Sequence, residues 1–166
     1  ATDRLFRAKQ RSRDLTLPVL VADLAAAERL AVVDDRARTV ADRFWPGALT
    51  LVLRRSEASR GWELGEERDT IGIRVPDHGV ALALLRRTGP LAVTSANRSG
   101  EPTPSGCDGV RAMLGDAISV YLCAGRASGR SSTVLDVTGP QPRVLRTGGI
   151  AEAQIFFSWP DRSERS

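Results

Sequence analysis

The stretch from Gly89 to Pro104 joins an apolar run to a cluster of hydroxyl and amide side chains. The strand-like run Leu91–Val93 ends abruptly in small polar residues and then breaks on one glycine and two prolines. The polar residues of this cluster are Thr94, Ser95, Asn97, Ser99 and Thr103. A strand that stops in such residues presents side-chain and backbone donors at a sheet end, where open α/β sheets hold anionic ligands. We therefore interpret this loop as the candidate ligand site rather than as an ordinary polar turn.

A basic pair precedes this loop in the chain. Lys9 and Arg11 are two residues apart, and such a pair can hold adjacent phosphate oxygens, with lysine as a point charge and arginine as a fork. Lys9 is the only lysine among the 24 basic residues, which suggests a position that needs a compact ammonium group. Basic pairs are also common on solvated surfaces, so both interpretations stay open at this point.

An arginine in the middle of a predicted strand forms the next candidate. In Thr70–Val75 the branched apolar residues alternate with Thr70, Gly72 and Arg74, so Arg74 lies on the face opposite to the apolar side chains. An arginine beside a glycine suggests close approach of a ligand, such as a carboxylate held by the guanidinium group. An arginine on the exposed face of a half-buried sheet is the alternative.

The last cluster combines Ser131–Thr133, which enters a predicted strand, with Arg146–Gly149, which leaves another. Hydroxyl groups and an arginine beside glycines suit phosphate or carboxylate binding, although turn chemistry alone would explain the glycines. The sequence has no Walker-type or dinucleotide-binding glycine motif and no paired-carboxylate arrangement. The only histidine, His78, argues against a Ser–His or Cys–His dyad. We assign no catalytic side chain, and the four clusters favour a reaction run by positioning and charge neutralisation, such as nucleotidyl transfer.

Composition limits the class of protein. The 166 residues, 42% of them hydrophobic, suffice for one globular domain with a core. The sequence shows no apolar run of about 20 residues and no leader pattern, so we expect a soluble, cytoplasmic protein without membrane contact. Cys107 and Cys123 have neither C-x-x-C spacing nor the density of a disulfide scaffold, which predicts two reduced thiols and no metal site. The net charge of +4 comes almost wholly from arginine and is weak evidence for nucleic-acid binding.

Hydrophobic periodicity and turn residues predict the elements that position these clusters. The predicted helices are residues 1–10, Leu24–Val33, Arg36–Phe44, Val80–Thr88 and Cys107–Leu114. The predicted strands are Leu17–Val21, Ala48–Leu53, Thr70–Val75, Leu91–Val93, Ala117–Leu122, Thr133–Val137 and Arg143–Arg146, the last two forming a hairpin through Gly139–Pro140. Residues 54–69 are interpreted as a charged loop or hairpin excursion. Hairpins are frequent and the βαβ rhythm is not strict, so we predict a mixed-sheet α/β domain over residues 1–150. A tail over residues 151–166 follows, and we expect Pro160–Ser166 to be disordered.

Six segments, in this order, resemble the YrdC-like family of threonylcarbamoyl-AMP synthases. They are K-Q-R at Lys9–Arg11, F-W-P-G-A-L-T-L-V-L at Phe44–Leu53, T-I-G-I-R-V-P at Thr70–Pro76, T-S-A-N-R-S-G-E-P-T-P at Thr94–Pro104, S-S-T-V-L-D at Ser131–Asp136, and V-L-R-T-G-G-I at Val144–Ile150. The resemblance implies a YrdC/RibB-like fold, in which a twisted mixed sheet and flanking helices surround a concave groove. It also implies condensation of ATP, bicarbonate and L-threonine to threonylcarbamoyl-AMP with release of pyrophosphate, using Mg²⁺ with ATP. The product serves the threonylcarbamoyladenosine modification of tRNA.

The resemblance assigns roles to the clustered residues by motif. The residues implied to bind ATP are Lys9, Arg11, Thr70, Ser95, Asn97, Thr103 and Arg146. For L-threonine, the implied residues are Arg74, which takes the carboxylate, together with Thr94 and Ser132. No residue is assigned to a protein-bound metal. The implied partners include proteins of a tRNA-modification complex.

The chain also departs from the family pattern. Family members carry a segment of the form P-T-[DE]-T-x-Y-G-L some tens of residues before K-x-R, and the sequence does not contain it. We therefore expect the sequence as given to show weak or no synthase activity and a tendency to associate. At Ser12–Leu17 the family has Asn-Pro before the strand, whereas this chain has Leu17-Pro18, which puts one nucleotide contact in doubt.

Other functions fit the same residues. One is an inactive paralogue of the synthase. Another is the related carbamoyl-adenylate chemistry of larger carbamoyltransferases, although the zinc-finger modules of those proteins do not occur here. An RNA-binding or ribosome-maturation module that contacts tRNA or double-stranded RNA is the third, because the isoelectric point is about 10.0. Binding of RNA would weaken steeply with salt, whereas ATP would stabilise an enzyme against unfolding.

Overall fold

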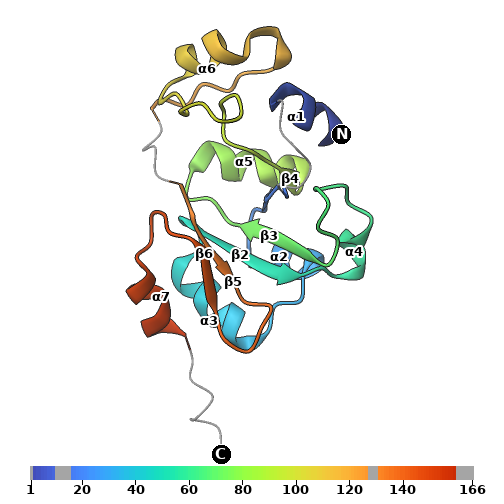
Figure 1. The fold of residues 1–166 in the computed structure, drawn as a ribbon, viewed down its shortest axis with the longest axis vertical. Helices are drawn as coiled ribbons and strands as arrows, with labels where there is room; N and C mark the ends of the chain where they lie inside the picture. The colour runs from blue at the N-terminus through green and yellow to red at the C-terminus, as the bar shows by residue number, and fades with distance from the viewer. Residues whose placement is uncertain (1, 10–15, 127–130, 160–166) are drawn as a thin grey trace, which may run out of the picture.

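A six-stranded mixed sheet forms the centre of the computed structural model, which describes residues 2–9, 16–126 and 131–159 (Figure 1). The strands are β1 (Val19–Leu20), β2 (Leu49–Arg54), β3 (Thr70–Arg74), β4 (Leu91–Ala92), β5 (Thr133–Asp136) and β6 (Arg143–Arg146). Their order across the sheet is β4-β1-β3-β2-β5-β6. The predicted α/β class with a mixed sheet is confirmed.

Strand direction varies across the sheet. The pairs β1–β3 and β2–β5 are parallel, whereas β1–β4, β2–β3 and β5–β6 are antiparallel. The β5–β6 pair is the predicted hairpin, and its register shifts between Val134 and Leu135. Strands far apart in sequence therefore become neighbours at the centre of the sheet, which brings the motifs of β2, β3 and β5 together.

Helices cover the sheet and extend beyond its edge. They are α1 (Thr2–Lys9), α2 (Leu24–Leu30), α3 (Asp35–Phe44), α4 (Glu57–Arg60), α5 (Gly79–Thr88), α6 (Cys107–Leu114), the 3₁₀ turn η1 (Gly115–Ala117) and α7 (Glu152–Ser158). The elements α1 and α6 lie at one end of the molecule, at the top of Figure 1, and α3 and α7 lie towards the other end. None of the helices in the described part of the chain is long and apolar enough to cross a bilayer.

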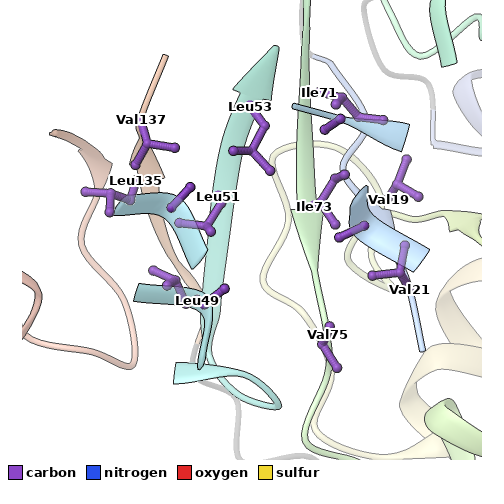
Figure 2. Close-up of a cluster of buried hydrophobic side chains, with 14 of the residues drawn as sticks. Val19, Val21, Leu49, Leu51, Leu53, Ile71, Ile73, Val75, Leu135 and Val137 are labelled. Atoms are coloured by element: carbon purple, nitrogen blue, oxygen red, sulfur yellow. The ribbon is translucent and has the colours of Figure 1, made fainter. Parts of the chain in front are cut away.

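The main hydrophobic core lies between one face of the sheet and helices α2, α3 and α7. Side chains alternate along each strand, so every second residue faces the core, and these residues are apolar (Figure 2). Leu49, Leu51 and Leu53 of β2 are buried there beside Ile71 and Ile73 of β3. The helices contribute alanines, Leu30, Val40 and Ile155 to the same cluster. The remaining residues of β2, β3 and β5 must then face the opposite side of the sheet.

The charged excursion at residues 54–69 is tied to the core by a buried arginine. Arg55 is 4% exposed, and its guanidinium donates to the backbone carbonyl oxygens of Ser59 (3.3 Å), Trp62 (2.9 Å), Glu67 (2.9 Å) and Thr70 (2.8 Å). These bonds to backbone oxygens satisfy the buried guanidinium and fold the excursion around it, and the charges of Glu67, Asp69 and Glu63 favour its protonated form.

The structure differs from the sequence predictions at residues 54–69, where the short helix α4 forms, and at two segments nearer the C-terminus. The predicted strand Ala117–Leu122 is wrong: η1 ends at Ala117, and residues 118–126 run without strand pairing. Val120 and Leu122 are 71% and 62% exposed, so their apolar side chains do not mark a buried strand. Beyond Ile150, where the sequence shows no clear pattern, helix α7 forms because Ile155 is fully buried against α3. The Pro160–Ser166 prediction lies outside the described residues.

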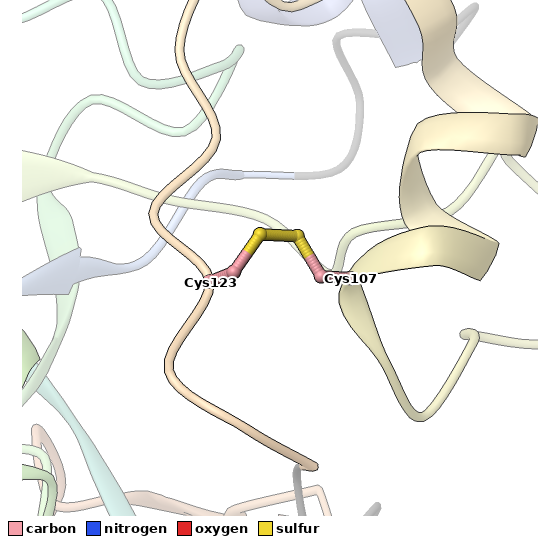
Figure 3. The surroundings of a disulfide bond; sticks show 2 residues. All are labelled: Cys107 and Cys123. Carbon is pink, nitrogen blue, oxygen red and sulfur yellow. A yellow bond between two sulfur atoms is a disulfide. The ribbon is translucent and has the colours of Figure 1, made fainter.

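The prediction of two reduced cysteines is also wrong. Cys107, the first residue of α6, and Cys123, in the extended segment after η1, form a disulfide with their Cα atoms 5.6 Å apart (Figure 3). The segment after η1 returns along α6: the Tyr121 hydroxyl donates to the Gly115 carbonyl oxygen at 2.7 Å, and the Arg111 guanidinium of α6 lies 4.8 Å from the centre of the Tyr121 ring. This return brings together two cysteines that are 16 positions apart in sequence, a proximity that spacing alone does not reveal.

Candidate functional site

The face of the sheet opposite the core carries the polar residues of three central strands. Thr50 lies on β2, Gly72 and Arg74 lie on β3, and Ser132 directly precedes β5. A Cβ atom added at Gly72 would lie in ordinary contact with Thr50 Cγ2, at 3.5 Å, and with Pro18 Cβ, at 3.6 Å. These residues form a polar floor, and we call the group Thr50, Arg74, Ser132 and Arg146 the floor cluster.

Arg74 is held by the turn that precedes β2. Its Nε donates to the carbonyl oxygen of Gly47 at 2.7 Å, and the Gly47 N–H donates to the carbonyl oxygen of Val75 at 2.9 Å. The turn contains a cis Trp45–Pro46 peptide bond. A Cβ atom at Gly47 would lie 2.2 Å from the Phe44 carbonyl oxygen, so a larger residue does not fit there. The F-W-P-G segment thus orients Arg74 of β3.

Arg146 approaches the same face from β6. Its Nη2 donates to the Ser132 carbonyl oxygen at 2.9 Å and to Ser132 Oγ at 3.1 Å. Burial lowers the pKa of Arg74 from its ordinary value, and the nearby charge of Arg146 lowers that pKa further. An arginine side chain does not lose its proton in a protein at neutral pH, so the Arg74 guanidinium stays charged despite this lowering. Within the described chain neither arginine forms an ion pair, so two cations share this face without a carboxylate.

The turn after β6 fixes the position of Arg146. The Thr133 hydroxyl donates to the Ile150 carbonyl oxygen at 2.7 Å and accepts from the Gly148 N–H at 2.9 Å. A Cβ atom at Gly148 would lie 2.4 Å from the Ser131 carbonyl oxygen. Only glycine at position 148 therefore lets the T-G-G turn pack against the S-S-T segment. The S-S-T segment and the T-G-G turn, about 15 residues apart in sequence, therefore pack together as one structural unit.

A second group joins helix α1 to the loop after β4. Lys9 is 4% exposed, and its Nζ donates to the Ser95 carbonyl oxygen at 2.7 Å and to Asn97 Oδ1 at 2.5 Å, as well as to the Asn97 carbonyl oxygen. The Ser95 hydroxyl donates to Asn97 Oδ1 at 2.6 Å, and the Ser99 N–H donates to the Lys9 carbonyl oxygen at 3.2 Å. We call Lys9, Ser95 and Asn97 the loop cluster. In this arrangement the ammonium group organises the loop, and a phosphate would compete with loop oxygens for it.

The structure thus brings the sequence-predicted site residues into two clusters and leaves others apart. Thr70 begins β3, four residues before Arg74, which is about 13 Å along the strand. Thr94 is half-buried just beyond β4, and Thr103 is exposed on the loop that leads to α6. Arg11 lies outside the described residues. The ATP and threonine roles of all these residues stay predictions.

Thr50 is the residue of this face that sequence reasoning missed. Its Oγ1 lies 2.8 Å from Ser132 Oγ, and continuation of the β2–β3 register, in which Leu51 pairs with Ile73, places Thr50 opposite Arg74. The available signal was one hydroxyl residue between two leucines of an otherwise apolar strand. That position must face away from the core if the leucines face into it.

The described residues contain no group of three or more His, Cys, Asp or Glu side chains that could hold a metal ion. The floor cluster and the loop cluster consist of cations, hydroxyls and an amide, a donor set suited to anions rather than to metals. Chemically, the arrangement can bind and orient carboxylate and phosphate groups.

Comparison with known proteins gives a consistent family match. A sequence profile for the Sua5, YciO and YrdC proteins, described as "Telomere recombination", matches residues 1–148. A Mycobacterium tuberculosis relative is 43% identical over 157 residues, which are 93% of this chain and 72% of the relative, and its name assigns it provisionally as a threonylcarbamoyl-AMP synthase. The threonylcarbamoyl-AMP synthase of Bacillus subtilis is 39% identical over 158 residues, covering 93% of this chain and 46% of that protein.

A solved structure shares the architecture as well. Pyrococcus abyssi Sua5 complexed with L-threonine aligns with a TM-score of 0.89 at 36% identity, over 95% of this chain and 47% of that one.

Proposed function

This chain belongs to the Sua5, YciO and YrdC family, and on that premise we propose that it is an L-threonylcarbamoyladenylate synthase. The reaction joins ATP, bicarbonate and L-threonine into threonylcarbamoyl-AMP and releases pyrophosphate. The product would then supply the threonylcarbamoyladenosine modification of tRNA.

The observation that carries the proposal is the pair of arginines on the face of the sheet opposite the core. Arg74 is held by Gly47 through Nε, its two Nη atoms have no hydrogen-bond partner among the described residues, and Arg146 lies close enough to affect the pKa of Arg74. A bound carboxylate would offset one of these two charges and accept two parallel hydrogen bonds from a guanidinium group. L-threonine supplies that carboxylate, and Arg74 is the residue that we expect to take it.

The reaction needs charge neutralisation more than proton transfer from a protein side chain. Bicarbonate and the amino group of threonine first form a carbamate with loss of water. A carbamate oxygen then attacks the α-phosphorus of ATP, the bond from that phosphorus to the bridging oxygen breaks, and pyrophosphate leaves. Both partners are anionic, so preorganised cations and N–H groups lower the barrier by holding them together. Arg146 and the loop cluster are the groups that we expect to do this for the nucleotide.

Mg²⁺ would enter this site with ATP. Mg²⁺ is ordinarily held by substrate phosphates, water and one or two carboxylates, and the two clusters offer hydroxyl and amide oxygens but no carboxylate. The ion would supply neutralisation of phosphate charge. The part of this chain would be to hold the nucleotide through Arg146, Ser95 and Asn97.

The test is threonine-dependent pyrophosphate release by the purified 166-residue protein, with mass spectrometry of the nucleotide product. We expect release that requires ATP, bicarbonate and L-threonine together and that stops when D-threonine replaces the L-isomer. Release should be weak in the 166-residue protein and should increase when a P-T-[DE]-T-x-Y-G-L segment is joined ahead of residue 1. Complementation of a synthase-deficient bacterial strain tests the same activity in cells. A protein that binds RNA with a steep salt dependence, and that neither binds L-threonine nor releases pyrophosphate, would contradict the proposal.

A further inference from the structure

The centre of the floor cluster is a pair of buried hydroxyl groups. Ser132 is implied to contact L-threonine, whereas Thr50 has no role assigned above. Thr50 is 5% exposed and Ser132 is 6% exposed, and their oxygens lie 2.8 Å apart. Buried hydroxyls are satisfied by hydrogen bonds, so their protons have to be accounted for.

The protons of the pair can be counted. Two hydroxyls carry two protons, and the bond between Thr50 and Ser132 uses one of them whichever group donates. The Arg146 guanidinium only donates, so it occupies a lone pair of Ser132 Oγ and takes up no proton. One hydroxyl proton of the pair therefore remains for an acceptor outside it.

The position of Thr50 indicates where that acceptor lies. On one side its methyl carbon is next to Gly72 of β3, in the register that places Thr50 opposite Arg74. On the other side its hydroxyl meets Ser132 at the start of β5. An anion on Arg74 would lie over the same floor, within reach of the spare proton. Accepting a bond from Arg146 also polarises Ser132, which strengthens the bond that the pair can donate.

We propose that Thr50 is a positioning residue of the amino-acid subsite: it holds the Ser132 hydroxyl in place so that the pair donates one hydrogen bond to an oxygen of the bound amino acid. This inference rests on the proposed function, because L-threonine is the ligand. Thr50 acts through Ser132, so its effect should depend on the Ser132 hydroxyl being present.

The experiment measures L-threonine affinity by calorimetry for four proteins. Thr50→Val removes the hydroxyl at nearly constant shape and is expected to raise the dissociation constant roughly 3- to 10-fold, the loss typical of one neutral hydrogen bond. Thr50→Ser keeps the hydroxyl and should stay within about twofold of the wild type. The matched control Thr39→Val changes an exposed threonine on α3, on the other side of the core, and should leave the affinity unchanged. Thermal unfolding of each protein checks that the fold is intact.

A double-mutant cycle separates positioning from packing. In a Ser132→Ala background, Thr50→Val should change the dissociation constant by less than about twofold, because the group that Thr50 orients is absent. An effect of Thr50→Val as large in that background as in the wild type would overturn the inference, as would equal losses for Thr50→Val and Thr50→Ser. If Thr50→Val does not fold, the same cycle is run with Thr50→Ala.

The failure of this inference and the failure of the proposed function give different results. A wild-type protein that binds L-threonine but releases no pyrophosphate contradicts the synthase proposal, and the cycle still decides the role of Thr50. A wild-type protein with no affinity for L-threonine overturns both.

Discussion

Arg74 lies beside a second cation, Arg146, whose charge adds to burial in lowering the pKa of Arg74. Like charges on a half-buried face reduce the stability of the unliganded protein unless an anion joins them. The same relationship makes the face a receptor for carboxylate or phosphate. The consequences can be measured at individual residues.

Replacement of Arg74 by lysine tests whether the forked guanidinium group binds the carboxylate of L-threonine. Lysine keeps the charge, but it lacks both the Nε donor that reaches Gly47 and the bidentate geometry. We expect the dissociation constant for L-threonine to rise roughly 10-fold or more, since hydrogen bonds to charged groups contribute about 1.5–3 kcal/mol. Calorimetry measures this change. The matched control is Arg54→Lys, at the exposed end of β2. An affinity of Arg74→Lys within twofold of the wild type would falsify the carboxylate role.

Replacement of Lys9 by methionine tests the loop cluster. Methionine keeps the length of the side chain but removes the donor, which leaves the oxygens of Ser95 and Asn97 without their charged partner. We expect a loss of about 1–3 kcal/mol in the free energy of unfolding, together with weaker ATP binding and little change for L-threonine. Urea unfolding and calorimetry measure the two effects. Arg7→Met, exposed on the same helix, is the control, and equal stabilities of the two variants would contradict the structural role of Lys9.

Removal of the disulfide tests how α6 is tethered. The double variant Cys107→Ser/Cys123→Ser opens a loop of about 15 residues, and the chain-entropy model assigns such a loop about 3 kcal/mol of stability. Thermal unfolding of the wild type with and without reductant should show a difference of the same sign, and the double variant should no longer respond to reductant. Titration of thiols in the denatured, unreduced protein checks the pairing directly. Two free thiols there would show that the bond does not form.

The acid stability of the β5–β6 hairpin should depend on Asp136. Burial alone raises the pKa of this carboxyl group, but hydrogen bonds from Thr138 and the charge of Arg143 outweigh burial, so the pKa lies below its ordinary value. A depressed pKa means that the unfolded state binds protons more readily. The contribution of Asp136 to stability is therefore present above the unfolded pKa and is lost as the pH falls through the folded pKa.

The comparison of Asp136→Asn with the wild type measures this contribution. The variant should be less stable at neutral pH, and the difference in unfolding free energy should shrink as the pH falls below about 4, the unfolded pKa of an aspartate. Asp42→Asn, exposed on α3, serves as the control. A difference between Asp136→Asn and the wild type that stays constant from neutral to acid pH would contradict the lowered pKa.

Local pattern predicted most of the elements because their signals lie within a few residues. The alternation in β3 and the Gly139–Pro140 turn are local signals, and the structure agrees with both. The start of α3 is also set locally, since the Asp34 side chain accepts from the Ala37 N–H at 2.8 Å and caps the helix. Local patterns gave wrong predictions of secondary structure where the burial of a side chain depends on distant parts of the chain. Val120 and Leu122 read as a strand but are exposed, and α7 depends on Ile155 finding a place against α3.

The residue types and motifs of this chain are enough to predict the family, the class of sheet and the side chains suited to anions. Which of those residues meet depends on the fold. The fold joins Lys9 to the Asn97 loop, pairs Cys107 with Cys123, and places Thr50 between Arg74 and Ser132. Strand register and chain reversal bring together residues that are far apart in sequence, so their spacing along the chain does not reveal which of them are close in space.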